Sequence, residues 1–298
     1  MRFTVKAPAS SANLGPGFDA IGLALDLWNE LTVEPSDEMA VRLDGSDGEM
    51  LIERENLSLT AMRILAHERQ QELPPVSLTV RAEVPVSRGL GSSAAAIVAG
   101  LLAANEIMQL GLSRKDLYQT AWRMEGHGDN VGAALYGGAI LSAPGVADAI
   151  CLSAHADLDL AAVVFIPEMT GATHAARAAL PSSIPLVDAA FNVATSSSLV
   201  AGFLTGNLEA IGAGMHDRMH EPYRARLFPH LEPVRSAARE AGAVGASLSG
   251  AGPCVLALVE RDRIDCVALR MEATAREIEA PGTVTTLAIA HQGAHIVR

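Results

Sequence analysis

Lysine is the scarcest charged residue of this 298-residue chain, occurring only at Lys6 and Lys115. Arginine supplies the other positive charges, and acidic residues outnumber basic ones, which leaves a formal net charge of −12. This balance argues against nucleic acid or an anionic membrane as the main partner, because both need a basic surface. A site for an anion must therefore be built mostly from arginine and backbone N–H groups.

Cysteines and long apolar runs are also few. Cys151, Cys254 and Cys266 are odd in number and widely spaced, so they support neither a disulfide framework nor a zinc site. A reducing compartment is the simplest interpretation. The longest apolar run, 94–104, is too short to span a membrane, and the N-terminus lacks a signal-peptide pattern. The sequence predicts a soluble, cytoplasmic protein with no membrane partner.

Hydrophobic residues make up 49% of the chain, which excludes general disorder, and the length suits two domains. Strands and helices mix without regular βαβ alternation, which favours an α+β fold over a doubly wound sheet. A domain boundary is expected between 145 and 160. Strands are expected at 3–7, 31–43, 76–84, 136–143, 161–166, 254–259 and 284–290, and helices at 57–69, 92–109, 113–124, 186–215, 231–241 and 262–279.

The segment 85–95 (PVSRGLGSSAA) has the composition of a phosphate-binding loop. Gly89 and Gly91 let the backbone approach a ligand, and Ser92 and Ser93 open a helix whose first N–H groups are free. The alternative is a glycine turn with serine caps, but the apolar helix that follows favours phosphate binding. It is not a Walker A loop, because no Gly-Lys-Ser/Thr follows. The expected nucleotide contacts are Pro85, Val86, Ser87, Arg88, Gly89, Leu90, Gly91, Ser92, Ser93, Ala94 and Ala95.

Two further segments are rich in small residues. Residues 8–19 (PASSANLGPGFD) predict an ordered loop that carries Asn13 and Asp19, although a Pro/Gly turn with Asx caps suits the same residues equally. Residues 245–253 (GASLSGAGP) predict close backbone approach to a ligand, or a tight crossover beneath a helix.

The segment 125–131 (EGHGDNV) places four polar side chains within six positions of otherwise apolar sequence. Glu125 or Asp129 could hold Mg²⁺ through oxygen. A capped loop with a satisfied core histidine is the alternative, and His127 by itself favours it.

These four segments, in this order, resemble the GHMP kinase superfamily and, within it, the homoserine kinase family. The stretches THAARAALP (173–181) and DRMHEPYR (217–224) also look like that family, and the resemblance spans about residues 3 to 295. It implies two lobes: an N-terminal α+β domain (1–155) that carries the phosphate loop, and a C-terminal ferredoxin-like domain (156–298). It further implies a homodimer and an ATP- and Mg²⁺-dependent phosphorylation of the L-homoserine hydroxyl to O-phospho-L-homoserine, for threonine biosynthesis.

The resemblance also implies roles for individual residues. Ser92 and Glu125 would hold Mg²⁺, although some family branches place the acid where this chain has Gln119 or Thr120. Arg177 and Arg224 would take the substrate carboxylate, since the guanidinium fork suits it. The remaining expected substrate contacts are Asn13, Asp19, His127, Thr173 and Gly250.

Two alternatives remain for the proton of the hydroxyl. Asp129 could act as the base with Asn130 orienting the hydroxyl, or the proton could pass to a phosphate oxygen without a protein base. Gly128 stands where the family often has proline, which should loosen the loop.

Two alternatives also remain for the activity. The chain could be a kinase of the same superfamily for another small alcohol, such as mevalonate or a sugar, or a non-catalytic ATP-binding regulator. The pair Arg177 and Arg224 favours a substrate that has a carboxylate.

Overall fold

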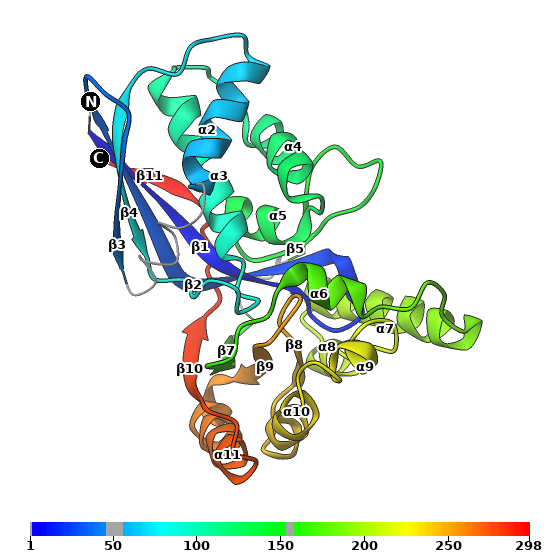
Figure 1. Cartoon of the computed structure of the whole chain (residues 1–298). Coiled ribbons are helices and arrows are strands. Elements are labelled where there is room, and N and C mark those ends of the chain that lie inside the picture. The colour runs from blue at the N-terminus through cyan, green and yellow to red at the C-terminus, as the bar shows by residue number, and fades with distance from the viewer. Residues whose placement is uncertain (1, 46–55, 153–157) are drawn as a thin grey trace.

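Two sheets form the framework of a computed structural model that describes residues 2–45, 56–152 and 158–298 (Figure 1). The first sheet has the order β11-β1-β2-β4-β3, with β5 pairing with both β2 and β6. Its neighbours are antiparallel except for the parallel pair β3 and β4. Its strands are β1 (Phe3–Asn13), β2 (Gly17–Pro35), β3 (Ala40–Gly45), β4 (Val76–Ala82), β5 (Ala139–Leu141), β6 (Ile150–Cys151) and β11 (His295–Val297).

Four helices cover one face of the first sheet (Figure 1). The most apolar of them, α3, packs its alanine and leucine side chains into a core shared with β1, β2 and β4. Ser113 and Asp116 form the capping box that their spacing favours and fix the start of α4. The helices are α2 (Leu57–Glu68), α3 (Ser92–Ile107), α4 (Arg114–Glu125) and α5 (Asp129–Tyr136).

The second sheet has the antiparallel order β10-β7-β9-β8. Along β7, Val163 and Phe165 pack against α10 and α11, while Ala162 and Val164 face a core shared with the first lobe. The chain order βαββαβ is that of a ferredoxin-like domain, so the predicted two-lobed α+β fold is confirmed. The elements are β7 (Leu160–Pro167), α10 (Leu231–Glu240), β8 (Gly245–Leu248), β9 (Val255–Glu260), α11 (Ile264–Glu277) and β10 (Gly282–Ala288).

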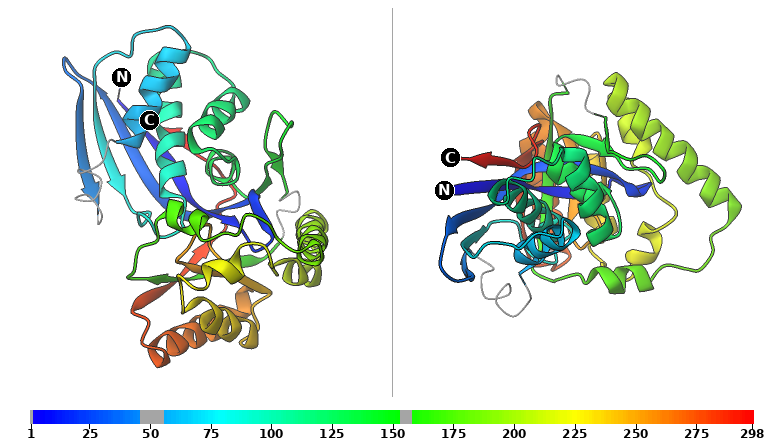
Figure 2. Two further views of the ribbon diagram at one scale, coloured as in Figure 1. Left: turned by 45° about the vertical axis from the view of Figure 1, so that its right-hand side comes forward. Right: turned by 90° about the horizontal axis from the view of Figure 1, so that it is seen from above.

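Four helices lie between β7 and α10. The short helices α6 and α9 lie at the junction of the lobes, whereas α7 runs along the outer edge of the molecule (Figures 1 and 2). Of the described helices, only α7 is long and apolar enough to cross a membrane, by length and composition alone. The helices are α6 (Thr173–Ala178), α7 (Leu186–Thr205), α8 (Leu208–Gly214) and α9 (Glu221–Arg224).

Several expected elements differ from those observed. Residues 8–19 are not a loop, because β1 and β2 pair through most of this segment. The expected strand 31–43 contains parts of two strands, because β2 ends at Pro35 and β3 begins at Ala40. The expected strand 136–143 contains only β5, because α5 extends to Tyr136. Gly206, with a left-handed φ of 73°, ends α7 inside the expected helix 186–215. The short elements α5, α6, α9, β6, β8 and β11 were not expected.

The division of the chain at residue 155 stays a prediction, with one exception. Strand β11 pairs with β1, so residues 295–297 belong to the sheet of the first lobe although the expected C-terminal domain includes them. Arg114 of α4 donates to the carbonyl of Ala294 and holds the same segment.

Candidate active site

A cavity of about 370 Å³ lies at the junction of the lobes and collects most of the residues singled out by the sequence. Its wall includes every predicted site residue except Ala94 and Ala95. The expected residues on the wall are Asn13, Asp19, Pro85, Val86, Ser87, Arg88, Gly89, Leu90, Gly91, Ser92, Ser93, Glu125, His127, Asp129, Asn130, Thr173, Arg177, Arg224 and Gly250.

In the loop between β4 and α3, the backbone carbonyls of residues 87–91 all accept hydrogen bonds from within the protein. Those of Ser87, Arg88 and Gly89 accept from Gly171 N, Cys254 N and Ser249 Oγ in the second half of the chain. Those of Leu90 and Gly91 accept from Ser10 N and Ala95 N. The first N–H groups of α3 have no partner among the described residues and can therefore bind an anion, as at other helix N-termini.

The loop glycines are needed for close packing. Gly89 has a φ of 80°, and a Cβ there would lie 2.3 Å from the carbonyl oxygen of Ser249. Gly91 has a φ of 68°, and its Cβ would lie 2.0 Å from Ser10 Oγ. Any side chain at these positions would push the loop away from both lobes.

Ala94 and Ala95 were expected to contact nucleotide, but they do not line the cavity. Their side chains are fully buried in the core between α3 and the first sheet. The helical turn that carries Ser92 and Ser93 into the cavity points the next two side chains the other way.

Ser92 and Glu125, the expected Mg²⁺ ligands, both line the cavity, and Glu125 is also bonded to Ser93, the neighbour of Ser92. Ser93 Oγ donates to Glu125 Oε2 over 2.9 Å, which brings the start of α3 to the end of α4. Two adjacent oxygen ligands beside a phosphate loop suit a hard divalent cation such as Mg²⁺. At the positions some relatives use for the acid, Gln119 bonds to the Ala147 carbonyl and Thr120 is buried against Glu68, away from this wall.

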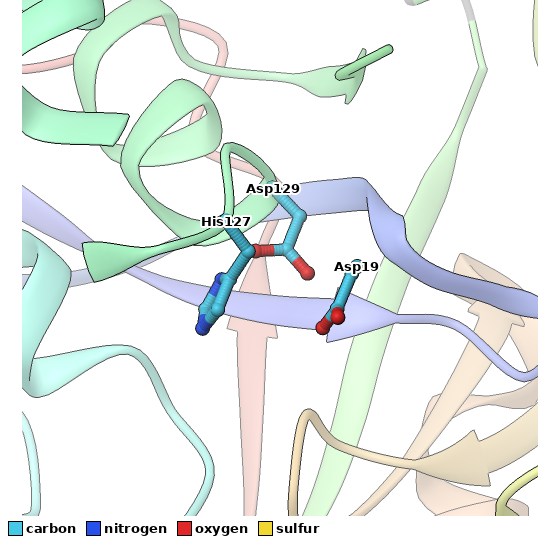
Figure 3. Close-up of side chains that lie close together, drawn as sticks. All are labelled: Asp19, His127 and Asp129. Carbon is cyan, nitrogen blue, oxygen red and sulfur yellow. The ribbon is translucent and has the colours of Figure 1, made fainter. Parts of the chain in front are cut away.

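Asp19, His127 and Asp129 come together on the wall beside the phosphate loop (Figure 3). One ligand atom from each lies within 4.8 Å of the others. His127 Nδ1 is 2.5 Å from Asp129 Oδ1, and Asp129 is almost fully buried. Burial lowers the pKa of His127, but the hydrogen bond and charge of Asp129 outweigh burial and hold that pKa above 6.5.

Arg177 forms a two-pronged ion pair with Asp19. Its Nη1 and Nη2 lie 3.0 and 2.7 Å from the two carboxylate oxygens, and this bond raises the pKa of Arg177. The guanidinium also lies 5.6 Å from the ring centre of Phe18. Asp19 comes from β2 and Arg177 from α6, so the pair bridges the two halves of the chain.

Arg224 is buried, with 2% of its surface exposed, and is therefore not a surface arginine. Its Nε donates to Ala176 O, and its Nη1 donates to Gly250 O and His220 Nδ1. Burial, together with the charge of Arg177, lowers its pKa to about 10, so the group stays charged at neutral pH. Among the described residues, Nη2 has no partner.

The polar groups of Asn13 and Gly250 are largely satisfied within the protein. Asn13 Nδ2 donates to Gly250 O and its Oδ1 accepts from Asp19 N. Asn130 Oδ1 accepts from Ser10 Oγ. These residues hold the wall together, whereas Thr173, at the start of α6, is exposed at the cavity.

The cavity wall also contains residues that the sequence did not predict as part of the site. Asn29 accepts from the N–H groups of Glu83 and Val84 and so fixes the entry to the phosphate loop. Asn56 caps α2 at the same wall. Asn29 acts on groups far along the chain, so no local motif marks it, whereas the bond of Asn56 to Leu59 N marks the start of a helix and not a binding site. The full set is Ala12, Asn29, Asn56, Leu57, Ser58, Val80 and Ala96, while Ala251 lies on the wall within the segment 245–253 that was expected to approach a ligand.

Comparison with known proteins agrees with this geometry. Residues 56–138 match the model of the GHMP kinases N terminal domain, and residues 199–277 match that of the GHMP kinases C terminal domain. Homoserine kinase from Moorella thermoacetica is 39% identical over 98% of this chain and 99% of its own length. The homoserine kinase from Gloeobacter violaceus is 42% identical over 91% of this chain and 92% of its own.

Solved structures give the same result. A crystal structure of homoserine kinase from Cytophaga hutchinsonii superposes with a TM-score of 0.88 at 30% identity, covering 99% of this chain and 97% of that one. A mevalonate kinase from L. major shares the fold at 18% identity, with a TM-score of 0.70 over 95% of each chain. The fold and the site thus define a GHMP kinase. Within that class, the chain belongs to the homoserine kinase family.

Proposed function

We propose that this chain transfers the γ-phosphoryl group of ATP to the hydroxyl of L-homoserine, giving O-phospho-L-homoserine, and does so in the cytoplasm as a step of threonine biosynthesis. Its homoserine kinase relatives and its GHMP kinase domains support this activity. The observation that carries the choice of substrate is the ion pair of Asp19 and Arg177 on the cavity wall.

An α-amino acid offers a new partner to each member of that ion pair. It carries an ammonium and a carboxylate on one carbon, so Asp19 receives the ammonium and Arg177 the carboxylate. The free Nη2 of Arg224 adds a second donor for the carboxylate, and a guanidinium suits that geometry. Mevalonate lacks the ammonium and a sugar lacks both charges, so neither would compensate both Asp19 and Arg177.

The nucleotide binds through the phosphate loop in this proposal. The free N–H groups at the start of α3 receive the phosphates, and Arg88 adds positive charge on the same wall. Ser93 and Glu125 would hold Mg²⁺, which would supply charge neutralisation for the phosphates. Phosphoryl transfer mainly requires such positioning and charge stabilisation.

For the proton of the hydroxyl, Asp129 is the favoured acceptor. Its carboxylate faces the same space as Asp19 (Figure 3) and is oriented by His127 and by the N–H of Asn130. Replacing Asp129 by Asn keeps the shape and removes the base. Loss of turnover with intact homoserine binding supports Asp129, whereas near-normal turnover supports transfer to a phosphate oxygen.

The decisive experiment measures ADP release with homoserine, mevalonate, galactose or no acceptor. Release with homoserine alone supports the proposal, and ³¹P NMR identifies the phosphorylated product. Release with another alcohol contradicts it, and ATP binding without any acceptor-dependent release indicates a regulator. The variants Arg177→Met and Arg224→Met should raise the KM for homoserine while leaving ATP affinity unchanged.

We also propose a homodimer that forms through α7. Asp188 is the only charged residue of this helix, so two copies can meet there despite the net charge of −12. Large side chains lie at both ends of the exposed stripe and mostly small ones between, which suits antiparallel packing about a two-fold axis. The stripe consists of Leu186, Ala190, Val193, Ala194, Ser197, Ala201 and Leu204.

A further inference from the structure

We propose that His220 is a positioning residue, whose neutral imidazole fixes the guanidinium of Arg224 for the substrate carboxylate. This inference rests on the proposed function. It concerns a histidine that does not line the cavity and is completely buried behind it. His220 precedes α9, and Arg224 lies four residues later, so one helical turn brings the two side chains to the same side.

The two ring nitrogens of His220 have different partners. Nε2 lies 2.7 Å from the carbonyl oxygen of Gly15, in the turn between β1 and β2. Nδ1 lies 3.2 Å from Nη1 of Arg224. A carbonyl can only accept and a guanidinium can only donate, so Nε2 carries the proton and Nδ1 is an acceptor. Both bonds can be satisfied only by one neutral tautomer.

The ring is held in this orientation from several sides. Asp217 Oδ2 accepts from the backbone N–H of His220 over 2.8 Å and also from that of Glu221. Asn192, from α7, donates to the other oxygen of Asp217. Phe18 packs against the imidazole with ring centres 5.2 Å apart. A ring fixed in this way presents Nδ1 at a single position.

The bond to His220 determines which N–H groups of Arg224 are left for a substrate. Nη1 uses both hydrogens on His220 and Gly250, and Nε uses its hydrogen on Ala176. Nη2 therefore remains with two hydrogens and no partner among the described residues. Without an acceptor at Nδ1, Nη1 would have an unbonded donor and the guanidinium could rotate about its long axis. Because Arg224 is buried, no bulk water would replace the missing acceptor.

The alternative is that His220 only fills space between the lobes. Two conservative variants separate the alternatives, because each preserves one of the two bonds. In His220→Asn, the side-chain oxygen can take the place of Nδ1 and accept from Arg224, while the bond to Gly15 is lost. In His220→Gln, the longer side chain can donate to Gly15 O, while the acceptor for Arg224 is lost. Both variants remove the same imidazole ring, so the loss of the ring itself does not distinguish them.

The experiment compares steady-state kinetics of the wild type and the two variants with homoserine and with 3-aminopropan-1-ol, which lacks only the carboxylate. Where 3-aminopropan-1-ol turns over too slowly, its inhibition constant against homoserine serves instead. We expect His220→Gln to raise the KM for homoserine by about tenfold or more, and His220→Asn to raise it by less than about threefold. Neither variant should change kcat or the KM for ATP appreciably, or the response to 3-aminopropan-1-ol.

The inference is overturned if the two variants raise the homoserine KM equally, if neither raises it, or if the loss is as large for 3-aminopropan-1-ol. Thermal unfolding of both variants verifies that they fold. A wild type that does not phosphorylate homoserine would contradict the proposed function itself, whereas an active wild type with indistinguishable variants would contradict only the role of His220.

Discussion

At the scale of single residues, unusual backbone conformations gather at the active site. Of the seven described non-glycine residues with positive φ, four lie in the segments 8–19 and 85–95 at this site: Asn13, Leu14, Asp19 and Ser87. Such conformations are costly and persist where surrounding contacts impose them. At Asn13 and Asp19 the amide of Asn13 provides these contacts, because it bonds both to the carbonyl of Gly250 and to the N–H of Asp19.

Gly128 gives the first prediction at this scale. The structure leaves no room for a side chain here, because the residue is buried and a Cβ would lie 2.2 Å from Ser142 Oγ and 2.4 Å from the Tyr118 hydroxyl. Gly128→Ala should lower the free energy of unfolding by about 1–3 kcal/mol, measured by urea denaturation. Adding Ser142→Ala should recover part of this loss. An unchanged stability in the single variant would contradict the prediction.

The second prediction at this scale concerns the stability contributed by His220. Burial, followed by the charge of Arg224, lowers the pKa of its imidazole below 6.5, although Asp217, Asp19 and the Gly15 carbonyl oppose this. Below pH 6.5 the unfolded chain therefore takes up a proton that the folded chain refuses, and stability is lost as pH falls. We expect denaturation midpoints between pH 7.5 and 5 to fall more steeply for the wild type than for His220→Asn. Parallel curves would contradict this.

At the scale of elements, α7 is unusual because one long face of it is not covered by any described part of the chain. Val193 exposes 69% of its surface there, while Leu199 and Phe203 on the opposite face are buried against α8 and the second sheet. The helix is about 30 Å long, so its stripe alone provides less contact area than stable dimers bury, and the adjoining loops must contribute to an interface.

The corresponding prediction concerns mass in solution. Val193→Asp should shift the protein from dimer to monomer, because it places a charge in the middle of the proposed interface. Light scattering coupled to size-exclusion chromatography measures this directly. Leu269→Asp on α11 is a matched control, because Leu269 is similarly exposed, at 66%, and lies outside the stripe. A wild type that is already monomeric would contradict the prediction.

The sequence predicted the site better than the elements that build it. The phosphate loop and the EGHGDNV segment are local motifs, so their residues could be assigned without tertiary information. The strand through Ala7–Asn13 could not, because its small residues are buried on both faces and show no alternation. Asn29 and His220 act on carbonyls and N–H groups that are distant in sequence, and only the folded chain brings these groups together.

At the scale of the whole molecule, the two lobes depend on each other. Ser249 Oγ bonds to Gly89 O and lies 2.8 Å from Ser11 Oγ, and Gly250 N donates to Ala12 O. The core that includes Leu23, Val164 and Leu256 contains residues of both sheets. Separation of the two lobes would therefore expose apolar surface and break the hydrogen bonds that hold the phosphate loop.

Calorimetry tests this dependence. We expect a single unfolding transition that ATP shifts upward as a unit, because a ligand of the native phosphate loop stabilises everything that holds the loop in place. A matched scan with adenosine, which lacks phosphates, should show a smaller shift. Two transitions, only one of which moves with ATP, would show that the lobes unfold independently.

The outward bonds of the phosphate loop also bear on how such an enzyme can evolve. Of the five carbonyls at residues 87–91, three are bonded by residues more than 80 positions later in the chain, at Gly171, Ser249 and Cys254. The proposed nucleotide site therefore depends on residues of both lobes, and recombination could not transfer it with the first lobe alone. Changes of substrate must arise by replacing side chains around a fixed loop, and the two lobes must be inherited together.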